Sequence, residues 1–91
     1  MWFVYIVRCA DGTLYTGITK DVTRRVAEHN AHGMSGAMYT RGRRPVALVY
    51  TEVLASRSAA ARREYAIKQM TRQGKDALVR SGRSARPLRA R

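Results

Sequence analysis

The hydrophobic and polar positions of the first twenty residues predict a β-hairpin. Residues 2–8 (WFVYIVR) are rich in β-branched and aromatic side chains, and residues 14–18 (LYTGI) resume the apolar pattern after Asp11-Gly12, a pair typical of tight hairpin turns. Strand alternation places Phe3, Tyr5 and Val7 on one face and Trp2, Val4 and Ile6 on the other. Both faces are apolar, so we expect helices to cover both at least in part.

A helix is predicted from about residue 22 to residue 31. Asp21 is a suitable N-cap, and Val26 and His29 share an apolar face with the first residue of the helix. Arg25 lies at the edge of this face, one turn before His29. The helix therefore presents an arginine and a histidine side by side.

The rest of the chain predicts one more strand and two more helical segments. Residues 31–45 (AHGMSGAMYTRGRRP) contain three glycines and indicate a long loop, which in a small domain often contacts the ligand. Residues 46–53 form a β-type run, residues 58–70 favour a helix, and residues 75–80 favour a short helical piece.

Composition predicts a single small domain with a polyanionic partner. The chain has 91 residues, 45% of them hydrophobic, which suffices for one compact core. Eighteen Lys and Arg against six Asp and Glu give a net charge of +12, which favours nucleic acid ahead of an anionic membrane. Arg-rich coding is the alternative source of the charge. The short apolar start resembles no signal peptide, so a cytoplasmic protein is expected, and Cys9, the single cysteine, is interpreted as a core residue.

The end of the chain differs from the rest. Residues 82–91 carry arginines and no acidic residue. We therefore expect one compact domain over residues 1–81, followed by a basic tail over residues 82–91 that is disordered when free.

Among the acidic residues, Glu64 is placed differently from the others. Asp11 belongs to a turn, Asp21 to a cap, Glu28 to a helix flank, Glu52 to a strand end, and Asp76 to an expected helix start. Glu64 lies on the helix face that carries small and apolar residues toward the sheet. An ion pair with Lys68 at i+4 is the simplest explanation of Glu64 taken alone.

Five polar side chains together supply what phosphodiester hydrolysis needs: Tyr5, Tyr15, Arg25, His29 and Glu64. A water must lose a proton, the phosphoryl oxygens need positive charge, and the leaving oxygen needs a metal ion or an acid. Tyrosine offers a hydroxyl, arginine a fork that matches phosphate, and glutamate a hard oxygen ligand. Composition alone leaves a structural role open, because most strand tyrosines are core or rim residues.

Short motifs in the chain resemble the GIY-YIG nuclease superfamily. VYI at residues 4–6 and YTG at residues 15–17 resemble its paired tripeptides, and the further matching positions follow in the family's order: Thr23-Arg24-Arg25, His29-Asn30, Tyr39-Thr40, Pro45 and Glu64. The resemblance covers about residues 2–80 and is closest to the small, stand-alone, single-domain branch. Val4 and Phe3 depart from the usual isoleucine and glycine, and Ile18 stands where some relatives carry a lysine, for which Lys20 is not a certain substitute.

The resemblance implies an α+β fold with a small three-stranded antiparallel sheet flanked by helices. It implies that Glu64 binds one divalent ion, Mg²⁺ or Mn²⁺, and that Arg25 stabilises the scissile phosphate. The tyrosines and His29 would position or deprotonate the attacking water, with Tyr5 favoured over Tyr15 as the base. We expect further cations to contact the nucleic acid: Lys20, Arg24, Arg41, Arg43, Arg44 and Lys68.

These observations predict a metal-dependent endonuclease that acts on structured or single-stranded DNA, in DNA repair or recombination, with DNA preferred over RNA. The second hypothesis is a non-catalytic nucleic-acid-binding module with the same fold. A third, a basic protein bound to ribosomal RNA, leaves Glu64 without a role.

Overall fold

Seven elements make up the α+β fold in a computed structural model that describes residues 1–31 and 36–81. In chain order they are β1 (Trp2–Arg8), β2 (Leu14–Thr19), α1 (Val22–Asn30), α2 (Met38–Arg41), β3 (Ala47–Leu54), α3 (Arg57–Lys68) and α4 (Arg72–Arg80). The predicted tail, residues 82–91, lies outside the described residues. No described helix is long and apolar enough to cross a membrane.

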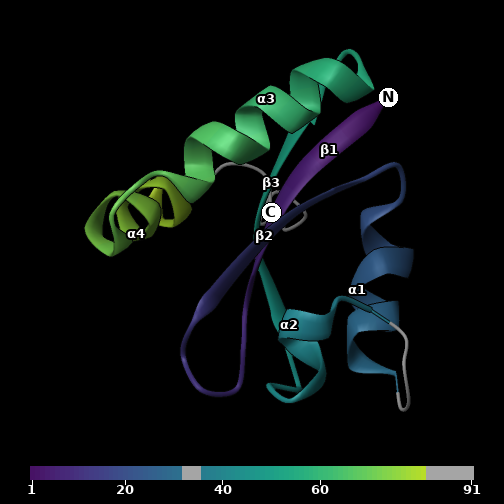
Figure 1. The fold of residues 1–91 in the computed structure, drawn as a ribbon, viewed down its shortest axis with the longest axis vertical. Helices are drawn as coiled ribbons and strands as arrows, with labels where there is room; N and C mark the ends of the chain where they lie inside the picture. Colours follow the sequence, from purple (N-terminus) through teal and green to yellow (C-terminus); the bar gives the residue numbers. More distant parts are fainter. Residues whose placement is uncertain (32–35, 82–91) are drawn as a thin grey trace, which may run out of the picture.

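The strands form one antiparallel sheet in the order β2-β1-β3, so β1 is central and β2 is an edge strand (Figure 1). The predicted hairpin is confirmed: β1 and β2 pair with Tyr5 opposite Gly17, and Gly12 adopts a φ of 86° in the turn. A positive φ is readily adopted only by glycine, which explains why Gly12 follows Asp11 there.

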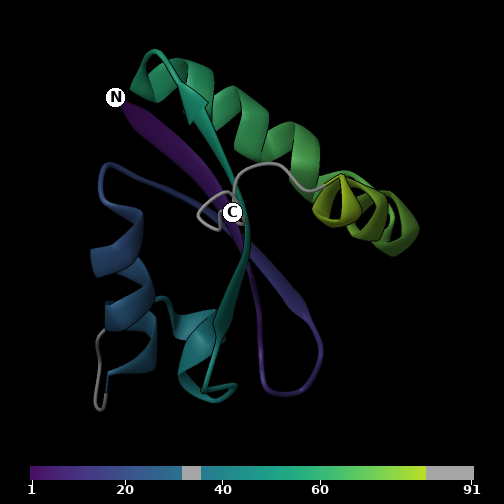
Figure 2. The ribbon, with the colours of Figure 1, turned by 180° about the vertical axis from the view of Figure 1, so that it is seen from behind.

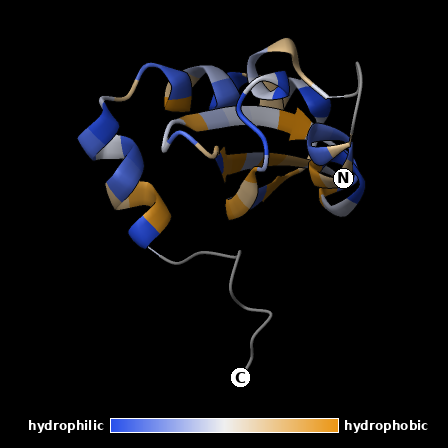
Figure 3. Cartoon of the chain, turned by 90° about the horizontal axis from the view of Figure 1, so that it is seen from below, coloured by the Kyte–Doolittle hydropathy of each residue, from blue (hydrophilic) through white to orange (hydrophobic). Residues whose placement is uncertain are grey.

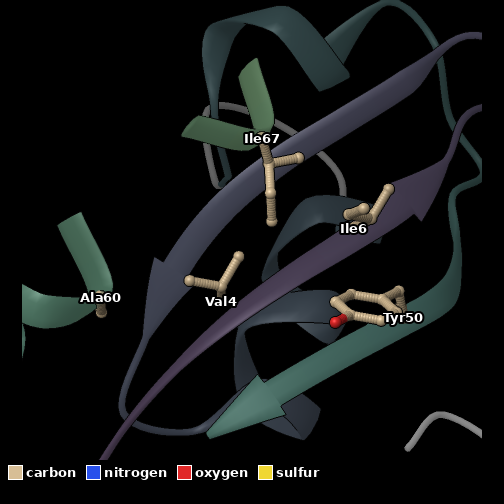
Figure 4. Packing of buried hydrophobic residues seen from close by; sticks show 5 residues of the cluster. All are labelled: Val4, Ile6, Tyr50, Ala60 and Ile67. Atoms are coloured by element: carbon tan, nitrogen blue, oxygen red, sulfur yellow. The ribbon is translucent and has the colours of Figure 1, made fainter. Parts of the chain in front are cut away.

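Helices cover both faces of the sheet, as the alternation predicted. On one face Val4 and Ile6 pack with Tyr50 of β3 and with Ala60 and Ile67 of α3 (Figure 4). All five are almost fully buried. The views from opposite sides show α3 and α4 in one layer and α1 and α2 in the other (Figures 1 and 2).

The second core lies between the sheet and α1. Tyr5, Val7, Cys9 and Val46 are buried there, and Val22 and Val26 of α1 pack against them. The expectation that Cys9 is a core residue is therefore confirmed. The strands carry much of the hydrophobic residue content, shown in orange, and the helices carry much of the hydrophilic content, shown in blue (Figure 3).

Side-chain caps fix where the helices begin. Asp21 accepts a hydrogen bond from the Arg24 backbone N–H at 3.0 Å, as predicted for α1. Thr71 accepts one from the Gly74 N–H at 3.0 Å and starts α4 at Arg72. The predicted start at residue 75 is wrong, because the Thr71 cap carries the helix through Gly74, a residue type that often interrupts helices.

Two further expectations need correction. Asp76 is not a helix-start residue: it lies within α4 and pairs with Arg72, one turn earlier, at 2.9 Å. The predicted loop over residues 31–45 contains the short helix α2, whose Thr40 is fully buried. Four residues are too few to show helical periodicity, and the glycines on either side hid this turn.

Candidate active site

The centre of the site is Tyr5, which lies in the middle of β1 and is 1% exposed. Its ring extends over the partner residue Gly17 of β2. A Cβ atom at position 17 would lie 2.6 Å from the Tyr5 hydroxyl oxygen, closer than real atoms approach. Gly17 therefore lets the hydroxyl reach the edge of the sheet. Burial raises the pKa of Tyr5 to about 12, so the hydroxyl is protonated at neutral pH.

His29 of α1 forms a hydrogen bond with the Tyr5 hydroxyl. The Tyr5 oxygen lies 2.7 Å from His29 Nε2, and the other ring nitrogen, Nδ1, lies 2.8 Å from Thr40 Oγ1. His29 is fully buried. Burial, with a smaller effect of the nearby Arg25 charge, lowers the pKa of His29 to about 4. The imidazole is thus neutral at physiological pH.

Tyr15 completes an aromatic cluster around this pair. Its ring centroid lies 6.4 Å from that of Tyr5 and 5.4 Å from that of His29. On another side, Tyr15 stacks on Tyr39 of α2 at 5.7 Å. Tyr15 and Tyr39 are both partly exposed, whereas Tyr5 is buried. Tyr15 is therefore the tyrosine of the predicted pair that is more open to a substrate.

Arg25 lies between the tyrosine cluster and the acidic flank of α1. Its Nη1 pairs with Glu28 Oε1 at 2.8 Å, and the side chain is 30% exposed. A hydrogen bond from Arg25 acts on Tyr5 and lowers the pKa of that hydroxyl, against the larger effect of burial. Glu28 and Tyr5 together raise the pKa of Arg25, so its guanidinium group stays positively charged. Arg25 thus holds positive charge beside the Tyr5 hydroxyl.

Glu64 and Lys68 reach the site from α3, in the other layer. Because β2 is an edge strand, side chains from both faces of the sheet can meet beside it. Lys68 Nζ lies 3.2 Å from Glu64 Oε2 and 5.8 Å from the centroid of the Tyr15 ring. The Glu64 charge also acts on Tyr5 and contributes to its raised pKa. The ion pair with Lys68 is therefore present and lies beside Tyr15, and the metal-binding role of Glu64 stays a prediction.

Two of the predicted nucleic-acid contacts, Arg43 and Arg44, already make contacts within the fold, and a third, Arg41, is partly buried. Arg44 Nε donates to the His29 carbonyl oxygen at 2.7 Å. Arg43 pairs with Asp11 at 3.1 Å and lies 4.0 Å above the Tyr39 ring. The Arg41 Nε atom is buried and, within the described part of the chain, has no hydrogen-bond partner. Arg43 and Arg44 therefore have structural roles beside the site, and their binding role stays a prediction.

The other two cations lie farther out. Arg24 pairs with Glu28 at 3.2 Å, and its side chain is 75% exposed, so it is open to solvent on α1. Lys20 lies 5.8 Å from the centroid of the Trp2 ring, near the end of the hairpin. Its contact with Trp2, rather than with a tyrosine of the cluster, gives no support to Lys20 as a replacement for the lysine that some relatives carry near this point.

Sequence reasoning did not assign functions to Thr40 and Asn30, although both belong to the motifs noted above. The Asn30 amide bonds the backbone of Val46 twice: Oδ1 accepts from the Val46 N–H at 2.7 Å, and Nδ2 donates to its carbonyl at 3.0 Å. This clamp ties the end of α1 to the approach to β3. Only the folded chain brings these positions together, so the motif order was the one available signal.

Comparison with known proteins defines the class. The sequence profile of the GIY-YIG catalytic domain matches residues 1–76, and the chain belongs to the GIY-YIG family. This domain points to a nuclease, and in general terms to an endonuclease, whose substrate is a nucleic acid.

The relatives are UPF0213 proteins, a small stand-alone branch of that family. The chain is 60% identical over 80 residues to a UPF0213 protein of Desulfotalea psychrophila, covering 88% of this chain and 72% of that protein. It is 60% identical over 78 residues to one from Halobacterium salinarum, covering 86% of this chain and 99% of that one. The solution NMR structure of a UPF0213 protein from Bacillus halodurans is 46% identical, with a TM-score of 0.55 over 87% of this chain and 83% of that chain.

GIY-YIG nucleases generally use divalent metals, and Glu64 fits such an ion in a limited way. Within residues 1–31 and 36–81, no three His, Cys, Asp or Glu side chains gather as a metal cluster. Mg²⁺, however, is commonly bound by one or two carboxylates together with water and substrate phosphates. Glu64 is 23% exposed and has Lys68 as its ion-pair partner. It can supply one such carboxylate.

Proposed function

We propose that this protein is a divalent-metal-dependent endonuclease that hydrolyses phosphodiester bonds in structured or single-stranded DNA and serves DNA repair or recombination. The observation that carries the proposal is the hydrogen bond between Tyr5 and His29, 2.7 Å long, flanked by the Arg25 charge. A buried Tyr-His pair beside a partly exposed arginine is suited to moving a proton next to a phosphate.

The proton path begins at the attacking water and runs through the Tyr5 hydroxyl to His29. As a water attacks phosphorus, its proton passes to the Tyr5 oxygen, while the Tyr5 proton passes to His29 Nε2. The new P–O bond forms as the bond to the leaving oxygen breaks. Tyr5 need not exist as a free tyrosinate, which its pKa of about 12 makes rare at neutral pH. His29 starts neutral and can accept the proton.

Positively charged groups on both sides of the edge strand β2 would stabilise the negative charge of the phosphate. Arg25 offers a planar fork to the phosphoryl oxygens, and Lys68 offers a second positive charge from α3. Glu64 would hold Mg²⁺ or Mn²⁺, which supplies Lewis-acid stabilisation of the leaving oxygen. Tyr15, partly exposed between these groups, would orient the water or the phosphate.

The substitution Glu64→Gln tests the proposal, because glutamine keeps the shape and helix propensity but removes the negative charge. Metal-dependent cleavage is expected to fall to background, while nucleic-acid binding stays the same or tightens. Asp76→Asn is the matched control: it too breaks an i,i+4 ion pair within a helix, with Arg72, but lies in α4 outside the site. It is expected to cleave like the wild type.

The substrates for this assay are single-stranded, duplex, flap and branched DNAs with matching RNAs, each with and without Mg²⁺ or Mn²⁺. Full activity of Glu64→Gln, or wild-type cleavage that persists in excess EDTA, would overturn the metal assignment. Preferential cleavage of the RNAs would overturn the assignment of DNA.

The second candidate function is a binding module without catalysis. The net charge of +12 supports it as well as it supports the enzyme. Wild-type protein that binds nucleic acid, yet cuts no member of the panel with either ion, would establish this alternative.

A further inference from the structure

We propose that Thr40 sets the tautomer of His29: it accepts the Nδ1 proton and so keeps Nε2 free to receive the proton of Tyr5. Thr40 is then a positioning residue of the site, acting through His29 without touching the substrate. Its effect on catalysis rests on the proposed function, whereas the tautomer is a property of the folded protein and can be measured without any substrate.

The first step is the burial of every group in the chain of contacts. Tyr5, His29 and Thr40 are each 1% exposed or less. Buried hydroxyl and imidazole groups are costly unless each proton has an acceptor. The positions of the protons can therefore be deduced by finding the arrangement that pairs all of them.

The second step starts at the carbonyl of Ala37, which can only accept. Thr40 Oγ1 lies 3.0 Å from this oxygen, and its single proton can be donated there. The lone pairs of Oγ1 then accept Nδ1–H of His29 across 2.8 Å. A neutral imidazole has one N–H, so Nε2 is left with a lone pair, to which Tyr5 donates across 2.7 Å. Every proton of the three side chains is paired.

The opposite arrangement leaves a proton without a partner. If Thr40 donated to Nδ1, then Nε2–H would point at the Tyr5 oxygen, and the Tyr5 proton would need another acceptor. Arg25, the cation whose effect on this hydroxyl lowers the pKa of Tyr5, has only donors and cannot accept that proton. The Ala37 N–H also points at Nδ1, with a long N···N distance of 3.4 Å. It competes with Thr40 for that nitrogen, but the 2.8 Å contact with Thr40 Oγ1 is much shorter and is the stronger interaction.

The third step is the fixed position of His29. A Cβ atom at Gly36 would lie 2.8 Å from His29 Cα and 3.1 Å from Nδ1, so the backbone of residue 36 packs directly against the histidine. Gly36 has a φ of 80°, which favours glycine there. The His29 carbonyl is held by Arg44 at 2.7 Å. The ring is thus confined with Nδ1 toward α2 and Nε2 toward Tyr5.

The tautomer of His29 decides whether the Tyr5 proton can move to Nε2. With Nε2 unprotonated, the Tyr5 proton has an acceptor at the moment the water proton reaches the Tyr5 oxygen. With Nε2 protonated, Tyr5 could not transfer its proton to His29, and the relay would stop. A threonine that contacts neither water nor phosphate would therefore control the rate of the chemical step.

The experiment compares Thr40→Val, which keeps the shape and removes the hydroxyl, with Thr40→Ser, which keeps the hydroxyl. Two-bond ¹⁵N–¹H correlation spectra of the full chain, labelled at histidine and recorded near neutral pH, identify the tautomer of His29. The wild type and Thr40→Ser are expected to show protonated Nδ1. Thr40→Val is expected to gain the Nε2-protonated form.

Cleavage kinetics supply the second readout. Thr40→Val is expected to lower kcat by about ten- to a hundredfold with KM nearly unchanged, and Thr40→Ser is expected to restore most of it. An Nε2-protonated wild type, or a folded Thr40→Val with unaltered tautomer and kcat, would overturn the proposal. If Thr40→Val does not fold, the wild-type tautomer decides. If the wild type cuts nothing, the proposed function fails, while the spectra still test the tautomer.

Discussion

At the scale of single residues, the contact between Gly17 and Tyr5 shows how backbone and site chemistry depend on each other. The Tyr5 ring lies directly over the backbone of β2, and its hydroxyl bonds His29 from there. A side chain at residue 17 would occupy the space of the ring. The last residue of the second tripeptide motif is thus required by geometry rather than by turn formation.

Gly17→Ala is accordingly expected to damage both stability and cleavage. The added Cβ would lie 2.6 Å from the Tyr5 hydroxyl oxygen and 2.8 Å from Cζ, and the buried ring has little room to move. Overpacking of this kind costs about 1–3 kcal/mol. Urea unfolding measures the loss, and single-turnover cleavage is expected to fall more than binding does. Gly42→Ala is the control, since a Cβ there meets nothing within 4 Å. Unchanged stability and rate in Gly17→Ala would contradict the fit described above.

The buried His29 also makes stability depend on pH. In the folded protein its pKa is about 4, against 6.5 for an ordinary histidine, because burial, Arg25 and Arg44 disfavour its charge while Glu28 opposes them weakly. Between these two values the unfolded chain binds a proton that the folded chain does not. The free energy of unfolding therefore falls as pH is lowered from about 6.5 to about 4, by about 3 kcal/mol in total.

His29→Gln is expected to remove this dependence. Urea denaturation of wild type and variant at pH 7 and pH 4.5 compares the two slopes, and subtracting them cancels the acids that titrate lower, such as Glu28 and Asp11. Equal slopes in the two proteins would mean that His29 is protonated in the fold as easily as in the unfolded chain.

At the scale of elements, the placement of α1 decides whether His29 reaches Tyr5. Its start is fixed by the Asp21 cap, and its end is fixed by Asn30, whose amide pairs with both backbone groups of Val46. Arg44 adds a bond to the His29 carbonyl. The connection between α1 and β3 is long, so these contacts, rather than a short loop, hold the helix against the sheet.

Removal of the clamp by Asn30→Ala is expected to destabilise the protein by about 2 kcal/mol, since two hydrogen bonds to the backbone disappear together. Asn30→Asp keeps an acceptor for the Val46 N–H but has no donor for its carbonyl, and it is expected to be intermediate. Thermal or urea unfolding ranks the three proteins. An alanine variant as stable as the wild type would show that other contacts hold α1.

At the scale of the whole molecule, the sequence predicted what strong local patterns determine. The hairpin, α1, β3 and α3 were all found, with ends shifted by a residue or two. The short α2 was missed because a single helical turn is too short to show a periodic hydrophobic pattern. The start of α4 was missed because the Thr71 cap starts the helix before Gly74, a residue type that often interrupts helices. Contacts between residues far apart in the sequence cannot be predicted from local patterns. The sequence around Thr40 does not indicate that it contacts His29, and the sequence of α3 does not indicate that it brings Lys68 to Tyr15 around the edge strand β2.

The overall charge is the other whole-molecule property, and it leads to the last prediction. Residues 82–91 contain four arginines and no acid, so removing them lowers the net charge from +12 to +8. Each phosphate that the protein no longer neutralises changes the slope of log affinity against log salt by about 0.7–0.9. A chain ending at Ser81 is therefore expected to bind single-stranded and duplex DNA more weakly and with a flatter salt dependence. Cleavage at saturating substrate is expected to persist, since Tyr5 and its partners are untouched.

A full-length chain with glutamine at the four arginines is the matched control, because it removes the same charges and keeps the length. Fluorescence anisotropy with labelled oligonucleotides, measured across a range of salt concentrations, gives the slopes. If both variants flatten the slope equally, the charges of the tail bind the phosphates. If the truncated chain keeps the wild-type slope, the tail does not touch the nucleic acid, and the salt dependence arises from exposed cations of the domain such as Arg24.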